Sequence, residues 1–236
     1  MAAKKKLLSF ISDENLYSAV KDILDVAQYA AYKNEDYIYR NAIDPFSALF
    51  DTALQNITLK EWLGKEASRQ IQKTLQNTLG DFHQTILGSL PGWENLERGH
   101  VFDIRNTRKM IIAEIKNKYN TTKGNHKTAI YDDLKAQLDG KYKGYVAYYV
   151  EVIPQNKKTY NKEFTPPDNR TKTQRPANKS IRVVDGKTFY GIATGDKKAL
   201  KKLYEALPTV ISEILGHPLK SITEDKLFTE LFEKIY

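Results

Sequence analysis

Two charged residues interrupt an apolar segment that is otherwise typical of a buried strand. The segment MIIAEIK (110–116) carries Glu114 and Lys116, and Asp103 lies upstream of it in VFDIR. Side chains alternate across a strand, so Glu114 and Lys116 point to the same face. Because unpaired charge in an apolar setting is costly, these residues indicate either a catalytic site or a structural ion pair.

The chemistry depends on whether Asp103 reaches Glu114. Counting over a short polar turn at 106–108 places Asp103 opposite residue 111, so a twist, bend or bulge would have to bring it closer. Two converging carboxylates form a hard-oxygen site suited to Mg²⁺. A lysine beside them can orient or help to deprotonate a water, or stabilise charge on a phosphate. Hydrolysis of a phosphodiester requires these groups together.

Spacing alone does not decide between the two interpretations. An acid followed two residues later by lysine occurs six times in this chain. The other five pairs fall at turns, at helix starts or on an amphipathic helix, and only Glu114 with Lys116 interrupts an apolar strand. The residues by themselves leave both a catalytic site and an ion pair open.

The surrounding pattern predicts a mixed α/β sheet flanked by helices. Helical periodicity covers 13–33, a short segment after Pro45, and 59–90, where Thr58 and Glu61 form a capping box. The expected strands and remaining helix follow in the order 101–105, 110–116, helix 128–139 and 144–153. A hairpin is expected around Asp185-Gly186, followed by helices to the end of the chain.

Composition favours a polyanionic partner. The 236 residues carry 37 Lys and Arg against 29 Asp and Glu, a formal net charge of +8. Cysteine is absent, which excludes disulfides, a thiolate nucleophile and zinc-cysteine sites and fits a reducing cytoplasm. The N-terminal segment is too short in apolar residues for a signal peptide, and no run reaches the length of a membrane span.

Much of the positive charge lies in one segment, residues 155–182, which has eight basic and two acidic residues. Its composition allows a disordered basic linker. It also allows an arm that enters a DNA groove, where arginine can bind guanine bidentately. The candidate contacts on this arm are Asp168, Arg170, Lys172 and Arg175.

A polar loop is expected over 117–127, directly after the charged strand. Amides, hydroxyls and lysines beside a metal site suit phosphate contacts and groove reading, although an ordinary polar loop has the same composition. The candidate DNA contacts are Asn117, Lys118, Asn120, Thr121 and Lys123, with Thr122 and Asn125 beside them. His83, alone on a helix, is interpreted as a packing or capping residue.

Asp103 followed by Glu114-Ile-Lys116 on a strand resembles the PD-(D/E)XK nuclease signature, with Phe102 where that signature has proline. The segments AEIKNKYNTTKG and NTLGDFHQ resemble the type II restriction endonucleases that cut GGNCC or GGWCC sites. The likeness extends over most of the chain and is strongest over 58–150.

This resemblance implies a restriction-endonuclease-like fold and Mg²⁺-dependent cleavage of double-stranded DNA by a homodimer, each subunit cutting one strand. It implies that Asp103 and Glu114 hold the metal and that Lys116 positions and activates the water. A further group often comes from a helix before the core; Glu66 is the candidate, with Gln70 second. The simpler interpretation of Glu66 is an exposed, solvated glutamate.

The sequence therefore predicts a type II restriction endonuclease in the cytoplasm of a bacterium or archaeon, with a palindromic site that matches a two-fold dimer. A single nuclease domain is expected over 1–236: a helical part (1–92), a catalytic core (93–155), the basic arm (155–182) and a C-terminal hairpin with helices (183–236). The alternatives are a basic DNA-binding protein without catalysis and a structure-specific repair nuclease with the same core.

Overall fold

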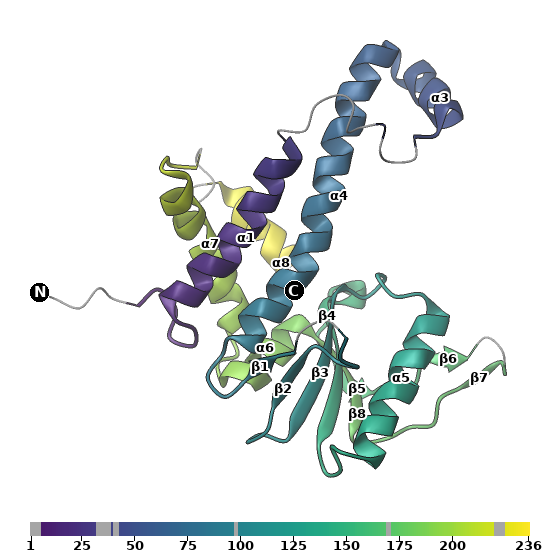
Figure 1. Ribbon diagram of the computed structural model, residues 1–236, viewed down its shortest axis with the longest axis vertical. Coiled ribbons are helices and arrows are strands. Elements are labelled where there is room, and N and C mark those ends of the chain that lie inside the picture. Colours follow the sequence, from purple (N-terminus) through teal and green to yellow (C-terminus); the bar gives the residue numbers. More distant parts are fainter. Residues whose placement is uncertain (1–5, 32–38, 40–42, 97–98, 169–170, 220–224) are drawn as a thin grey trace, which may run out of the picture. The chain divides into compact units, whose positions relative to one another are not determined.

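The computed structural model describes residues 6–31, 39, 43–96, 99–168, 171–219 and 225–236. The chain divides into two compact units, one made of residues 1–20 with 82–236 and the other of residues 21–81. The first unit contains the sheet, and the second is helical (Figure 1). The expected organisation as a single nuclease domain stays a prediction.

The described elements follow one another in this order: α1 (Asp13–Ala31), α3 (Pro45–Gln55), α4 (Leu59–Gly88), β1 (Glu94–Asn95), β2 (Ile104–Asn106), β3 (Ile111–Lys118), α5 (Gly124–Asp139), β4 (Val146–Ile153), the 3₁₀ turn η1 (Gln155–Lys157), β5 (Asn161–Glu163), β6 (Pro167–Asp168), β7 (Thr173–Gln174), β8 (Ile181–Asp185), α6 (Gly186–Thr194), α7 (Ala199–Leu215) and α8 (Lys226–Ile235).

The main sheet of the first unit is mixed, with strand order β1-β2-β3-β4-β8-β5. Its three central strands β3, β4 and β8 are parallel, whereas β1, β2 and β5 add antiparallel edges. The helix α5 makes the crossover from β3 to β4, as a parallel pair requires. The predicted mixed α/β sheet with flanking helices is confirmed (Figure 1).

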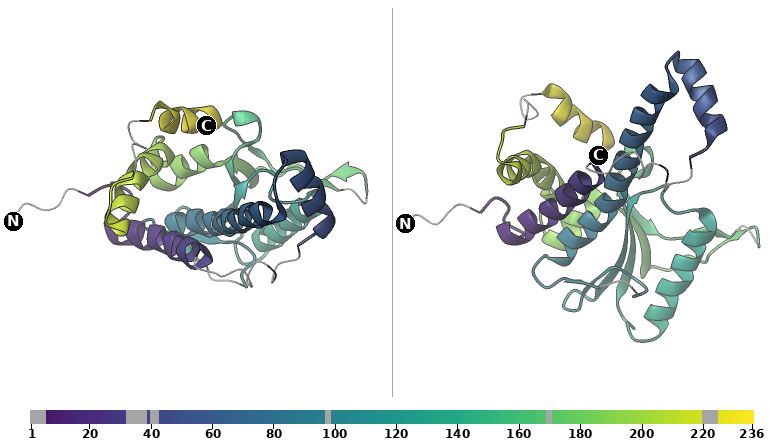
Figure 2. Two further views of the ribbon diagram at one scale, coloured as in Figure 1. Left: turned by 90° about the horizontal axis from the view of Figure 1, so that it is seen from above. Right: turned by 45° about the horizontal axis from the view of Figure 1, so that its top comes forward.

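Both faces of the central strands are covered, which explains why these strands are nearly continuous apolar runs. On one face α5 packs Tyr131 and Leu134 into a core with Ile112, Ala147 and Ile181. On the other face α6 follows β8, and the rings of Phe189 and Tyr148 lie 5.5 Å apart. Figure 2 shows α5 and α6 on opposite sides of the sheet.

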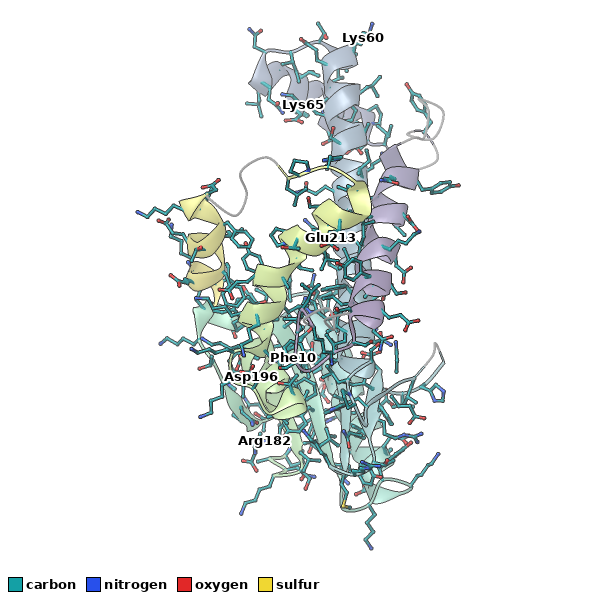
Figure 3. The ribbon with its side chains drawn as sticks, turned by 90° about the vertical axis from the view of Figure 1, so that its left-hand side faces the viewer. Phe10, Lys60, Lys65, Arg182, Asp196 and Glu213 are labelled. Atoms are coloured by element: carbon teal, nitrogen blue, oxygen red, sulfur yellow. The ribbon has the colours of Figure 1, made fainter. Side chains whose placement is uncertain are left out.

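The first turns of α1 belong to the same unit. Leu16, Ala19 and Val20 are buried there, each less than 4% exposed. The hydroxyl of Tyr17 donates a hydrogen bond to the carboxylate of Glu213. Glu213 lies on α7 (Figure 3). This bond joins α1 to α7, which are far apart in the sequence.

The hairpin expected around Asp185-Gly186 is wrong. The backbone passes from β8 directly into α6, and the Asp185 side chain caps that helix by accepting a hydrogen bond from Thr188 N at 2.9 Å. A Cβ on Gly186 would lie 2.5 Å from the carbonyl oxygen of Val152, so glycine permits a close approach of α6 to β4. Asp-Gly here serves a helix start rather than a turn.

In the second unit, the capping box at the start of α4 is confirmed. Thr58 N donates to the Glu61 carboxylate at 2.8 Å, and Glu61 N donates to the Thr58 hydroxyl at 3.2 Å. The indole of Trp62 donates to Asp51 of α3 at 3.0 Å, which fastens the two helices together. The helix α4 continues through Gly80 without a break. No described helix is long and apolar enough to cross a membrane.

Candidate active site

The turn between β2 and β3 brings Asp103 to Glu114. It spans residues 107–110, because Asn106 pairs with Ile111 and the Asn106 side chain accepts a hydrogen bond from Lys109 N at 2.9 Å. The shorter turn expected at 106–108 is therefore wrong, and so is the register that placed Asp103 opposite residue 111. Ile104 pairs with Ala113 instead.

The observed register itself places Asp103 at the level of Glu114. Residues 101–103 form a bend, so the strand expected over 101–105 is wrong at its start, and β2 begins at Ile104. Asp103 N donates to the Ala113 carbonyl at 3.0 Å, and Asp103 Oδ2 accepts from Ile115 N at 2.6 Å. The aspartate is thus held by the residues on either side of Glu114. The two carboxyl groups predicted to converge do so.

Glu114 and Lys116 form an ion pair on one face of β3. Their side chains are 13% and 28% exposed, so the pair is mostly enclosed but open to solvent on one side. Burial, together with the charge of Asp103, raises the pKa of Glu114 to about 7. The lysine opposes this rise without cancelling it. The site therefore places two carboxyl groups beside one ammonium group.

Two adjacent carboxylates fit a small divalent cation. Within the described part of the chain, no group of three or more His, Cys, Asp or Glu side chains has the arrangement of a metal site. Mg²⁺ does not require one, since it keeps several waters and is commonly held by one or two carboxylates. Asp103 and Glu114 supply that donor set, and the Lys116 ammonium lies beside it.

A second charged cluster at the same level of the sheet was missed in the sequence. Lys116 pairs in register with Glu151 of β4, and Glu151 pairs with Asp185 of β8. Glu151 is only 5% exposed, and its two oxygens accept from Lys127 Nζ at 2.5 Å and from the hydroxyl of Tyr160. The sequence could have indicated this cluster, because Glu151 is the single charged residue in the apolar strand VAYYVEVI. Glu114 stands out in its own strand for the same reason.

The loop that follows Lys116 is shorter than the sequence predicted. Asn117 and Lys118 still belong to β3, and α5 begins at Gly124, so the prediction of a polar loop to residue 127 is wrong. Lys127 on the first turn of α5 donates to the carbonyl of Tyr119 at 2.9 Å, a tertiary contact that local composition does not reveal. The candidate DNA contacts Asn120, Thr121 and Lys123 are exposed on the loop between these elements.

The basic arm is ordered where it is described. It forms η1, β5 on the edge of the main sheet, and the hairpin β6–β7, so a disordered linker is excluded for these residues. Lys172 is exposed, and Asp168 is buried. Arg175 forms ion pairs with Asp132 and Asp168. Arg170 lies outside the described residues.

Glu66 belongs to the second unit, as does Gln70. Glu66 is 7% exposed and bonds both Nε and Nη2 of Arg69 at 2.5 Å, and the Gln70 amide donates to it at 3.0 Å. The arginine lowers the pKa of Glu66. The interpretation of an exposed, solvated glutamate is therefore wrong, and a role in catalysis stays a prediction.

His83 packs as interpreted. Its Nδ1 lies 2.9 Å from the Tyr190 hydroxyl, and its ring meets those of Phe82 and Tyr190 edge to face. Enclosure lowers the pKa of His83 to about 4, so the imidazole is neutral at pH 7.

Comparison with known proteins gives matches along nearly the whole chain. The family model described as Eco47II restriction endonuclease matches residues 8–216. The chain is 39% identical over 237 residues to the type II restriction enzyme Eco47II of Escherichia coli, covering 98% of this chain and 99% of that enzyme. It is 30% identical over 234 residues to the type II restriction enzyme Sau96I of Staphylococcus aureus, covering 97% and 89%. No solved structure shows a significant match.

Proposed function

The chain belongs to the Eco47II restriction endonuclease family, and from this premise we propose that it cuts both strands of DNA at GGNCC or GGWCC sites in a Mg²⁺-dependent reaction. The observation that carries the proposal is the convergence of Asp103 and Glu114. Asp103 bonds to the residues on either side of Glu114, and Lys116 pairs with that glutamate. This constellation suits hydrolysis of a phosphodiester.

Asp103 and Glu114 would hold the metal ion. The raised pKa of Glu114 supports this assignment, since a cation between the two carboxylates would offset the burial and the charge of Asp103 that raise it. When bound, Mg²⁺ supplies Lewis-acid stabilisation of charge at the phosphate. Glu66 is the proposed further acid from the second unit.

Lys116 has the chemistry of a water-positioning group. Its side chain is 28% exposed, so the ammonium is both anchored by Glu114 and accessible from solvent. An ammonium so placed can orient an attacking water, help to remove its proton, and offset charge that develops on the phosphate oxygens. Its methylene stem lies along the same face of β3 as Glu114, which fixes its direction.

DNA contacts come from two segments that follow the site residues in the sequence. The first is the end of β3 and the following loop, with Asn117, Lys118, Asn120, Thr121 and Lys123. The second is the arm with Asp168, Arg170, Lys172 and Arg175. The formal charge of +8 supports attraction to duplex DNA. A homodimer that cuts one strand per subunit suits a palindromic site, and the bacterial relatives support a cytoplasmic location.

Digestion of a plasmid of known sequence tests the proposal. Discrete fragments are expected with Mg²⁺ and none with EDTA, and the fragment ends should all fall at GGNCC or at its GGWCC subset. A smear of fragments that depends on the metal would indicate a structure-specific nuclease rather than a sequence-specific one. Intact plasmid together with salt-sensitive binding would mean that the charges on β3 are structural.

A further inference from the structure

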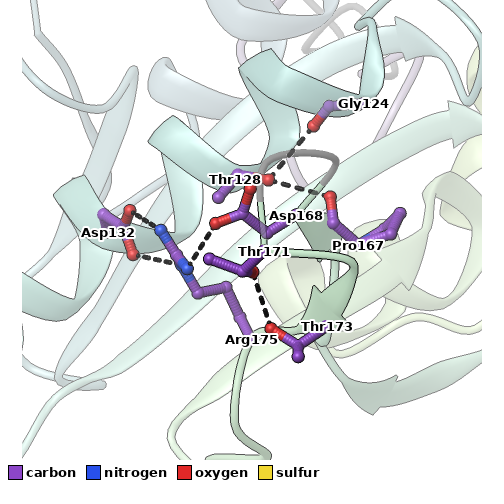
Figure 4. Close-up of polar contacts among 8 residues, drawn as sticks. All are labelled: Gly124, Thr128, Asp132, Pro167, Asp168, Thr171, Thr173 and Arg175. Carbon is purple, nitrogen blue, oxygen red and sulfur yellow. Dashed lines mark hydrogen bonds and ion pairs between the residues drawn. The ribbon is translucent and has the colours of Figure 1, made fainter.

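The hairpin β6–β7 is fastened to α5 through one side chain, Arg175. Its Nε and Nη2 donate to the two carboxylate oxygens of Asp132 at 2.8 and 2.7 Å, and its Nη1 donates to Asp168 Oδ2 at 2.9 Å (Figure 4). Asp132 lies on α5, and Asp168 ends β6. The guanidinium therefore bridges the helix and the hairpin.

Further bonds hold both ends of the hairpin against the same helix. The Thr128 hydroxyl of α5 donates to the carbonyl of Pro167 at 3.0 Å, where the hairpin begins (Figure 4). The Tyr131 hydroxyl donates to the carbonyl of Pro176 at 2.7 Å, just after it ends. Arg175 N closes the base of the hairpin by donating to the carbonyl of Pro166 at 3.0 Å.

This arrangement conflicts with the use of Arg175 as a base reader. Recognition of guanine requires a free pair of parallel N–H groups. One such pair on Arg175 is taken by Asp132, and Nη1 is directed to Asp168. The side chain is 26% exposed, and the Asp168 side chain is 11% exposed. Charge-assisted bonds of this kind, made with a planar fork, fix orientation strongly.

We propose that Arg175 is a positioning residue, which locks the hairpin β6–β7 onto α5 and so presents the exposed Lys172 to DNA in a preorganised form. The inference rests on the proposed function and refines it, because it removes Arg175 from the candidate base readers. Ordering the hairpin before binding lowers the entropic cost of association. The partner is duplex DNA, and the specific effect is on the affinity for it.

A base-reading role and a positioning role for Arg175 predict opposite effects of Asp132→Asn on DNA binding. If Arg175 contacts DNA directly, Asp132→Asn removes a competing negative charge and leaves DNA binding unchanged or stronger. If Arg175 is the clamp, the same substitution releases the hairpin and weakens binding. Asp133→Asn is the matched control, since Asp133 is also exposed on α5 and carries the same charge one position further along.

The experiment measures steady-state cleavage of a short duplex with one GGACC site by the full-length wild type, Asp132→Asn, Arg175→Gln, the double variant and Asp133→Asn. Asp132→Asn and Arg175→Gln should each raise KM about tenfold with little change in kcat. The double variant should be no worse than either single one, because both break the same contact. Asp133→Asn should leave KM unchanged or lower it.

Two outcomes would overturn the proposal: Asp132→Asn matching Asp133→Asn while Arg175→Gln alone raises KM, or no change of KM in any variant. Hydrogen exchange of the amides in 167–175, measured without DNA, gives an independent reading. Faster exchange in Asp132→Asn and Arg175→Gln, with that of Asp133→Asn unchanged, supports the clamp even if the wild type cuts no DNA. Unchanged exchange in all variants would show that Arg175 does not hold the hairpin against α5, even if the enzyme is a nuclease.

Discussion

Two charged clusters lie at the same level of the sheet and differ in how their charges are matched. In one, Glu114 lies beside Asp103 and Lys116, and burial, together with the charge of Asp103, raises the pKa of Glu114. In the other, Glu151 is more deeply buried, and each of its oxygens has a partner. Burial alone therefore does not mark a functional acid.

The difference follows from what each cluster contacts. The Glu151 cluster connects β4, α5 and the start of the basic arm through Lys127 and Tyr160, so its polar groups complete a packed core. The Asp103–Glu114 cluster stays open to solvent at Lys116, and the pKa of its glutamate is raised. Breaking the Asp103–Glu114 cluster should cost activity, whereas breaking the Glu151 cluster should cost stability.

The largest expected effect is on cleavage, at the two residues beside Glu114. Asp103→Asn and Lys116→Met should each lower the cleavage rate by at least about 10³-fold, since each removes a charge needed at the reacting phosphate. Single-turnover cleavage with Mg²⁺ measures this. Lys118→Met, on the same face of β3, is the matched control and should cut within about tenfold of wild type. Equal losses in all three variants would place the effect in DNA binding rather than in chemistry.

The second effect is on stability, in the closed cluster. Lys127→Met leaves Glu151 buried without its cation, and this should lower the free energy of unfolding by about 3 kcal/mol. Urea denaturation followed by circular dichroism measures the change. Lys135→Met on the same helix, where the ion pair with Asp139 is exposed, should change it by less than about 1 kcal/mol. Similar values for both would show that the closed cluster does not stabilise the fold.

The third effect is on stability at acid pH only and depends on His83, which belongs to neither cluster. Its pKa in the folded chain, about 4, lies below its ordinary value of 6.5, so the unfolded chain binds the proton more tightly. The stabilisation is complete above pH 6.5 and is lost as the pH falls toward 4, by about 3 kcal/mol. His83→Gln should remove this part of the pH dependence. An identical pH dependence in wild type and variant would contradict the assignment.

Local sequence patterns predicted helices and strands correctly where the pattern was unambiguous. The capping box at Thr58 and the apolar strands of the sheet formed as expected, because their periodicity agrees with the burial they meet. Glu114 was found because a charge in an apolar strand is conspicuous. The same signal at Glu151 was overlooked, since no second acid or lysine stands at short spacing beside it.

The remaining features depend on contacts between distant segments. Asp185-Gly186 has the composition of a turn, yet α6 begins there because Val152 leaves room only for glycine. The register of β2 against β3 was set by the Asn106 side chain, which extends the turn to residue 110. The engagement of Arg175 by Asp132 joins residues that are 43 positions apart, and no local pattern indicates it.

The most direct test compares Glu114→Gln with Glu151→Gln in one assay. Cleavage of duplex DNA is measured per folded molecule with saturating Mg²⁺, and the folded fraction of each variant is measured beside it. The account predicts that Glu114→Gln is folded and inactive, whereas Glu151→Gln is less stable but cuts at close to the wild-type rate per folded molecule. Cleavage that survives Glu114→Gln and is lost in folded Glu151→Gln would contradict the assignment of the active site.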